Sequence, residues 1–185
     1  MSENKEHKKR DIFTEGPIDP SFIAQSIAKH ATRHDIGAHG IFLGQVRADI
    51  RTRDGSINHA VTGIEYTAYR DMANEQMSII RDEAFARWPI TCLHVHHSQG
   101  VIKAGELCFF VFASSAHRQA AREAVAYVTD EVKQRLPIFG KEIMEDGEQV
   151  WKSAVLMGRG GGGGRGGGGG RRRRPDTMRS LREFP

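Results

Sequence analysis

The sequence predicts a single α+β domain. Its 185 residues, 38% of them hydrophobic, are enough for one core. Apolar stripes with helical spacing follow one another along the chain, separated by short apolar stretches that are typical of β-strands. Turn signals lie between pairs of these stretches, as in hairpins. Because hairpins join antiparallel strands, the pattern favours α+β over a doubly wound parallel sheet.

Three helices are predicted from apolar residues at steps of three and four. They are expected at residues 20–33, 73–88 and 114–136. Pro20 suits the first position of the first helix, and Pro89 and Pro137 end the second and third, because proline cannot continue a helix. Ser114 and Ser115 are the predicted start of the third helix, since serine often caps a helix.

Strands are predicted between the helices. Residues 41–50 and 61–68 flank the turn signal Asp54-Gly55, and we expect them to pair as an antiparallel hairpin. Residues 138–143 and 149–151 form a similar closing hairpin.

Two further strands are expected between the second and third helices. Residues 91–97 and 107–113 are both apolar, with Gly100 and Gly105 marking the turn between them. Residues 107–113 are apolar on both faces, which predicts a central strand covered from both sides.

The positive charge is concentrated at the C-terminus. Residues 158–185 hold eight arginines, two acidic residues and eleven glycines, so their net charge is +6 while the whole chain carries +4. We expect a flexible arm over residues 1–16, one domain over 17–157 and a disordered Gly/Arg-rich tail over 158–185. Arginine–glycine segments can bind RNA, but this tail has no aromatic residue before Phe184 for base stacking. Nucleic-acid binding is therefore only the alternative reading.

Other compositional features indicate a cytoplasmic protein. No apolar stretch is long enough to span a membrane, and the first ten residues lack the apolar segment of a signal peptide. Cys92 and Cys108 are too few for a disulfide scaffold and are expected to be reduced core residues. His94 and His96 have the spacing of a metal-binding pair, but no third ligand is evident, so no metal site is expected.

Basic residues gather at three places in the predicted domain. They are Arg47 at a strand end, His117 and Arg118 at the start of the third helix, and Lys133, Arg135 and Lys141 around its end. Most such groups only keep a surface hydrated. The segment 114–118 is more specific, because free backbone N–H groups at a helix start and an arginine fork can bind an anion. This predicts a phosphate or carboxylate ligand.

Several motifs, in order along residues 17–154, resemble the large, catalytic subunit of molybdopterin synthase. They are Phe42–Arg47, Tyr66, Arg87–Pro89, His97 with Gly100, Gly105-Glu106, Ser115–Arg118, Lys133–Glu142 and Trp151-Lys152. The resemblance implies an α/β hammerhead fold with an additional antiparallel β-sheet. It also implies transfer of sulfur into cyclic pyranopterin monophosphate, which makes the dithiolene of molybdopterin. The sulfur would come from the Gly-Gly thiocarboxylate of a small ubiquitin-like carrier subunit, in a heterotetramer built on a homodimer of large subunits.

The implied reaction suggests roles for the basic residues. Both reactants are anions, so Arg47 and Arg118 are expected to bind them, with His117 and Gln45 as further substrate-binding residues. Lys133 is the expected catalytic proton-transfer group, because neighbouring cations disfavour the charged form of a lysine. No cofactor is expected.

Lys141 is the second expected catalytic residue, although the family pattern changes here. The family commonly has two basic residues before the glutamate that corresponds to Glu142, and Gly140 stands at the first of them. On a regular strand Lys141 faces the opposite side, so it could replace that residue only if Gly140 allows a bulge. A noncatalytic scaffold is therefore a further alternative.

The spacing of His117 and Lys133 predicts a site shared between subunits. The two residues are sixteen positions apart (117 to 133) on one expected helix, so their backbones lie about 24 Å apart. A small pterin phosphate cannot bridge that distance. If both residues serve one site, the helix start of one subunit must approach the helix end of another.

Overall fold

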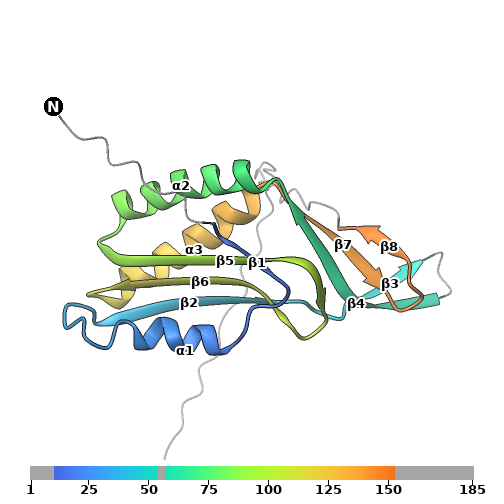
Figure 1. Cartoon of the computed structure of the whole chain (residues 1–185), viewed down its shortest axis with the longest axis horizontal. Helices are drawn as coiled ribbons and strands as arrows, with labels where there is room; N and C mark the ends of the chain where they lie inside the picture. Colours follow the sequence, from blue (N-terminus) through green and yellow to red (C-terminus); the bar gives the residue numbers. More distant parts are fainter. Residues whose placement is uncertain (1–10, 54–56, 153–185) are drawn as a thin grey trace, which may run out of the picture. The chain divides into compact units, whose positions relative to one another are not determined.

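A mixed β-sheet between helical layers organises the chain in the computed structural model, which describes residues 11–53 and 57–152 (Figure 1). In chain order the elements are β1 (Phe13–Glu15), α1 (Ser21–Ala28), β2 (Ala38–Gln45), β3 (Ile50–Arg53), β4 (Ile57–Ala68), α2 (Arg70–Arg87), β5 (Ile90–Lys103), β6 (Leu107–Ser115), α3 (Arg118–Arg135), β7 (Ile138–Met144) and β8 (Gln149–Trp151). The described elements belong to one compact unit. The predicted single α+β domain is confirmed.

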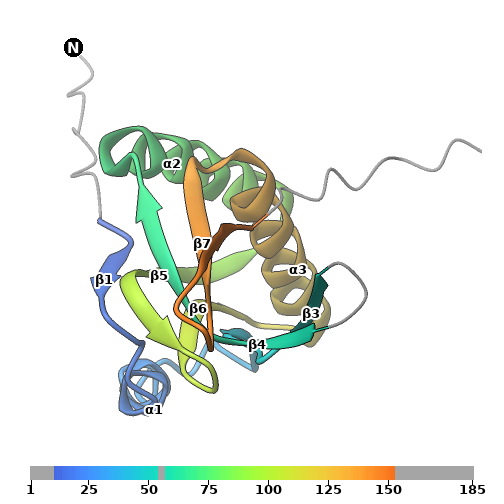
Figure 2. The same cartoon turned by 90° about the vertical axis from the view of Figure 1, so that its right-hand side faces the viewer.

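The sheet has eight strands in the order β2-β6-β5-β4-β7-β8, with β1 paired to β5 and β3 paired to β4. Helices α2 and α3 pack on one face and α1 on the other (Figures 1 and 2). Strand β6 lies between β2 and β5, and eight of its nine residues are buried, as expected for a central strand. Phe110 and Phe112 point to the α1 face, where Ile18 and Phe22 cover them.

The predicted helices differ from the observed ones most clearly at two ends, while α2 begins three residues earlier than expected. Helix α1 stops at Ala28 rather than near residue 33, because the chain continues in successive turns. Helix α3 begins at Arg118 rather than at the two serines. Ser114 and Ser115 are fully buried in β6, where Ser115 pairs with β2 on one side and β5 on the other. The Ser114 hydroxyl bonds His39 Nδ1 and the Ser115 hydroxyl donates to the His117 carbonyl, so neither hydroxyl caps the helix.

The predicted pairing of residues 41–50 with 61–68 is wrong. Strand β2 ends at Gln45 and pairs with β6, whereas the separate strand β3 forms the hairpin with β4. Residues 46–49 interrupt the chain between β2 and β3. Val46 N–H donates to the Glu106 carbonyl, and Asp49 N–H donates to the Arg47 carbonyl in a turn. The expected Asp54-Gly55 turn lies outside the described residues.

The turn between β5 and β6 also differs from the prediction. Gly105, with φ of 91°, lies in that turn, but Gly100 is inside β5 with φ of 79°. Residues before Gly100 pair with β6, and Gly100 to Lys103 pair with β4. A left-handed backbone conformation, which glycine adopts readily, thus lies where β5 changes partner. The closing hairpin of β7 and β8 is confirmed.

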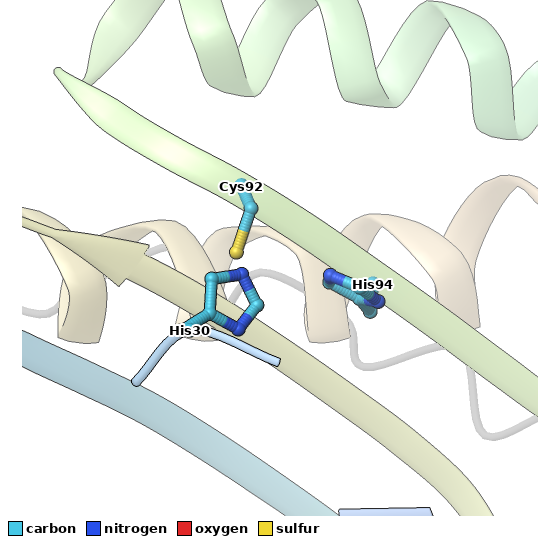
Figure 3. A group of neighbouring side chains, drawn as sticks. All are labelled: His30, Cys92 and His94. Atoms are coloured by element: carbon cyan, nitrogen blue, oxygen red, sulfur yellow. The ribbon is translucent and has the colours of Figure 1, made fainter. Parts of the chain in front are cut away.

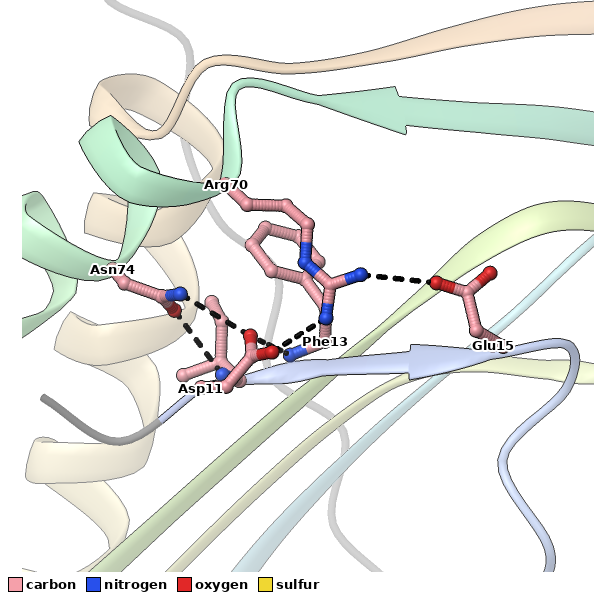
Figure 4. A network of polar contacts seen from close by, with 6 residues as sticks. Asp11, Phe13, Glu15, Arg70 and Asn74 are labelled. Carbon is pink, nitrogen blue, oxygen red and sulfur yellow. Dashed lines mark hydrogen bonds and ion pairs between the residues drawn. The ribbon is translucent and has the colours of Figure 1, made fainter.

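The expected flexible arm over residues 1–16 is too long. Phe13–Glu15 form β1, which pairs in parallel with β5, and Ile12 and Phe13 are buried. Arg70 at the start of α2 bonds both Asp11 and Glu15, and Asn74 bonds Asp11 and the Ile12 backbone (Figure 4). These polar contacts attach the segment to α2. Residues 1–10 and 153–185, which include the expected tail, are outside the described part.

Helix α3 lies unusually close to the edge strand β2. A Cβ added at Gly40 would come within 2.6 Å of the Ala121 carbonyl oxygen, so glycine is needed for this approach.

Among the described residues, no helix has the length and apolar character to cross a membrane.

Candidate active site

The C-terminal end of α3 places Lys133 beside side chains from neighbouring strands. Its Nζ lies 5.3 Å from the centre of the Phe42 ring on β2. The Tyr66 hydroxyl on β4 donates a hydrogen bond to Cys108 Sγ on β6 at 3.6 Å, and the Cys108 thiol donates to the Gly44 carbonyl at 3.5 Å. The ring of His97 on β5 lies 5.0 Å from that of Tyr66. We call Phe42, Tyr66, His97, Cys108 and Lys133 the Lys133 site.

Burial keeps the titratable groups beneath Lys133 neutral at neutral pH. It raises the pKa of the Tyr66 phenol, and the neighbouring Cys108 raises it further. Burial also raises the pKa of the Cys108 thiol, although the Tyr66 hydrogen bond and the charges of Lys152 and Lys133 partly oppose this. The pKa of His97 is lowered by burial and, to a smaller extent, by the Lys133 charge. The site therefore presents an exposed cation above neutral polar groups.

The Cys108 thiol is not prepared to act as a nucleophile. The sequence offered no basic neighbours for this cysteine, whereas the fold brings the charges of Lys133 and Lys152 close enough to act on it. The raised pKa shows that burial outweighs them. The thiolate is the reactive form of cysteine, so a raised pKa and burial agree with the expectation that Cys108 is a reduced core residue.

Lys141 and Gly140 face opposite sides of β7. Gly140 pairs with Tyr66 and Lys141 with Glu65, and the register is regular at this point, without the bulge that Lys141 would need to change sides. A Cβ at Gly140 would meet the Ile64 side chain at 3.1 Å and the Tyr66 ring at 3.5 Å. The Gly140 side therefore looks toward the Lys133 site.

Lys141 itself lies with a different aromatic residue. Its Nζ is 4.6 Å from the centre of the Trp151 ring on β8. Arg135, another expected neighbour of Lys133, is ion-paired with Glu83 on α2 and with Glu131. The cationic cluster expected around Lys133 is thus divided. The cation that the fold adds to the site is Lys152, whose backbone N–H donates to the Gly140 carbonyl at 2.9 Å.

Arg47 lies in the segment after β2, and its side chain is 83% exposed. Its guanidinium forms a two-point ion pair with Asp49, and this carboxylate raises the pKa of Arg47. An anion that binds Arg47 would have to share the guanidinium with Asp49. Gln45, the last residue of β2, is exposed and forms no described side-chain hydrogen bond to Arg47.

His117 and Arg118 lie at the opposite end of α3 from Lys133. Both are exposed, and both line a groove of about 1170 Å³ between α3 and β2. His117 directly precedes the helix and Arg118 is its first residue. Phe42 also lines this groove, so one aromatic residue contacts both the groove and the Lys133 ammonium group.

Comparisons with known proteins identify the family of this chain. The family model described as MoaE protein matches residues 13–135. The chain belongs to the MoaE family. A molybdopterin synthase catalytic subunit of Thermoplasma volcanium is 36% identical over 139 residues, which cover 75% of this chain and 94% of the relative. The Bacillus subtilis protein of the same name is 34% identical over 137 residues, 74% of this chain and 81% of the relative.

Two solved structures share the fold of this chain. The structure of molybdopterin synthase from Staphylococcus aureus matches with a TM-score of 0.64 and 28% identity, over 78% of this chain and 97% of that chain. A protein–protein complex of subunits 1 and 2 of the molybdopterin-converting factor from Helicobacter pylori matches with a TM-score of 0.62 and 18% identity, over 76% and 88% of the two chains.

Sequence reasoning missed part of this candidate site. Tyr66 and His97 were noted only as motif residues, and Lys152 was assigned no role. Their proximity depends on three strands that are distant in the sequence and on the end of β8. Gly140 was the one feature of the sequence that could have indicated this. A glycine has no side chain, so it leaves space that a side chain from a neighbouring strand can occupy.

Proposed function

We propose that this chain is the catalytic subunit of a molybdopterin synthase and transfers sulfur from a thiocarboxylated carrier into cyclic pyranopterin monophosphate. The single observation that carries this proposal is the Lys133 site, where an exposed ammonium group lies over an aromatic ring beside buried neutral polar groups. The family makes the chain an enzyme of molybdenum cofactor biosynthesis. The sulfur transfer and the roles below are our proposal.

Lys133 suits the chemistry at the reacting carbon. Sulfur enters as an anionic thiocarboxylate and the oxygen that it replaces leaves, so a group is needed that attracts the anion and gives a proton to the leaving oxygen. The ammonium of Lys133 does the first by its charge and the second by one of its dissociable protons. Water then cleaves the bond between the carrier's carbonyl carbon and the transferred sulfur, which releases the carrier as a carboxylate. Phe42 supports the lysine from below, and Tyr66 can donate its hydroxyl proton in a hydrogen bond to sulfur, as it does to Cys108.

Lys152 is the proposed second amine of the site, ahead of Lys141. Both Lys133 and Lys152 act on Cys108, whereas Lys141 lies on the other face of β7 against Trp151. The backbone N–H of Lys152 donates a hydrogen bond to the Gly140 carbonyl. Gly140 is the position at which the family commonly has a basic side chain. Lys141 is proposed to lie outside the reacting centre, on the surrounding surface, where it can contact the carrier.

The substrate phosphate is proposed to bind His117 and Arg118 of a second copy of the chain. Strand β2 is at the edge of the described sheet, and Ile41 and Leu43 on it are 41% and 42% exposed. An unpaired apolar edge favours pairing with another strand. Two-fold pairing along β2 would set two α3 helices antiparallel, so each helix start would approach the other helix end. Arg47 and Gln45 would then border the same groove.

The carrier is proposed to be a small ubiquitin-like subunit, which completes a heterotetramer with the homodimer. The Helicobacter pylori relative is itself a complex of two subunits. The C-terminal Gly-Gly segment of such a carrier has no side chains to obstruct its approach, so it can present its thiocarboxylate to the exposed Lys133.

The test is a reaction with purified components. The chain is incubated with cyclic pyranopterin monophosphate, with and without a thiocarboxylated carrier, and dithiolene product is measured. We expect product only in the complete mixture. Lys133→Ala should abolish it, while Lys29→Ala, which removes an exposed lysine beyond the end of α1, should not. A complete mixture that gives no product would instead favour the noncatalytic scaffold.

A further inference from the structure

A second group of chemically reactive side chains lies on the α1 face of the sheet. Cys92 and His94 are two residues apart on β5 and therefore point to the same face. His30, in the turn after α1, lies against them (Figure 3). One possible ligand atom from each of the three residues lies within 4.8 Å of those of the other two.

We propose that His30, Cys92 and His94 bind a zinc ion. Two imidazole nitrogens and one thiolate are a donor set that Zn²⁺ prefers, whereas Mg²⁺ and Ca²⁺ require oxygen ligands. Tetrahedral zinc needs four ligands, and water can take the fourth position at a half-buried site. The 4.8 Å limit is somewhat wider than the separation of ligands around one zinc ion, so small side-chain rotations complete the site.

The hydrogen bond of His30 already selects the required imidazole form. Its Nδ1 lies 2.7 Å from the Ser26 carbonyl oxygen, which can only accept a hydrogen bond, so Nδ1 carries the proton. The lone pair of a neutral His30 ring is therefore on Nε2. A backbone carbonyl that orients a metal-binding histidine in this way is a recurrent feature of metal sites.

Aromatic packing holds the three residues in place. The Phe112 ring lies 5.4 Å from the His30 ring and 5.5 Å from the His94 ring, measured between centres. Cys92 packs against the same apolar group as Phe112. Apolar surroundings limit access of water and so strengthen the attraction between a thiolate and a cation.

This zinc site is separate from the Lys133 site. Cys108 belongs to the core on the α2 and α3 face, whereas Cys92 packs with the group on the α1 face. Zinc would therefore join the turn after α1 to β5, and it would not supply the chemistry of sulfur transfer. The inference does not depend on the proposed function.

The experiment uses full-length, untagged protein from which metal has been removed with a chelator. Co²⁺ is added as a spectroscopic probe, because a thiolate bound to Co²⁺ gives a charge-transfer band and tetrahedral Co²⁺ gives intense visible bands. We expect both signals at one Co²⁺ per chain, and their loss when Zn²⁺ is added. Zinc affinity is then measured by competition with a chromophoric chelator.

The variants separate this site from other thiols and imidazoles. Cys92→Ser should abolish the charge-transfer band and weaken zinc binding by about 100-fold or more, because loss of an outer-shell contact alone costs 10–100-fold. His30→Gln and His94→Gln should weaken binding similarly. Cys108→Ser and His96→Gln should bind like the unchanged chain, since the His96 ring packs against Phe22 instead.

Melting temperature provides a second measurement if a variant is unstable. Zinc should raise the melting temperature of the unchanged chain and of His96→Gln, but not that of Cys92→Ser. The proposal is overturned if no charge-transfer band forms, if Cys92→Ser retains the band, or if zinc stabilises the Cys92→Ser variant as much as the unchanged chain.

Discussion

Mixing two inactive variants should restore about a quarter of the activity if each active site is shared between two chains. Helix α3 runs from Arg118 to Arg135 without a break. The sixteen positions from His117 to Lys133 therefore separate their backbones by about 24 Å. One small substrate cannot contact both residues of the same chain. His117→Ala and Lys133→Ala should each be inactive as homodimers, because every site lacks one of the two groups.

In a hybrid dimer, both defects fall in one site and the other site is intact. Random exchange makes half of the dimers hybrid, and half of their sites are intact, which gives the expected quarter. The assay is carrier-dependent formation of dithiolene after the variants have been mixed and exchange has been verified by native mass spectrometry. As a control, the double variant mixed with an equal amount of the unchanged chain should also give a quarter, because each site of such a hybrid lacks one of the two residues; a site within one chain would give a half. Verified hybrids without activity would refute the shared site.

The remaining predictions concern stability and the ends of the chain. Gly40→Ala should lower the free energy of unfolding by about 1–3 kcal/mol in chemical denaturation, because its Cβ would push α3 away from β2. For Asp11, burial raises the pKa, but hydrogen bonds from Phe13, Arg70 and Asn74 outweigh it and the pKa is lowered. Its contribution to stability is therefore present above the ordinary value of 3.8 and lost as the pH falls through the lowered pKa, so Asp11→Asn should flatten the pH dependence of unfolding below about pH 4. Truncation after Met157 should preserve folding and activity and remove any salt-sensitive RNA binding; RNA binding by the truncated chain would contradict this.

Elements with strong local signals could be predicted well from the sequence. Helix α2 has an apolar stripe, and Ala73, Met77, Ile80 and Ala84 are all buried as that stripe requires. The apolar character of β6 on both faces predicted its central position. In each case the signal lies within the element, so no knowledge of distant partners was needed.

Features that depend on distant partners were missed. Strand β2 resembled the first half of a hairpin, but its hydrogen-bonding partner is β6, more than sixty residues later. The serines before α3 have the chemistry of helix caps, yet pairing on both sides placed Ser115 in the sheet. The alternation of side chains along β7 was foreseen, and it places Lys141 on the face away from Gly140. The proximity of Lys152 to Cys108 could not be predicted, because it depends on the pairing of β8 with β7.

The order of strands in the sheet also has a kinetic consequence. Phe42, Tyr66 and Cys108 come from three strands, and the pairings β2–β6 and β4–β7 each join segments that are far apart in the chain. Such contacts form slowly, because long loops must close before any pairing is gained. No partly folded chain that lacks the β2–β6 pairing contains a complete Lys133 site, because Phe42 is on β2 and Cys108 is on β6. Recovery of activity during refolding should therefore follow the slowest closure of the sheet, rather than the earlier formation of the helices.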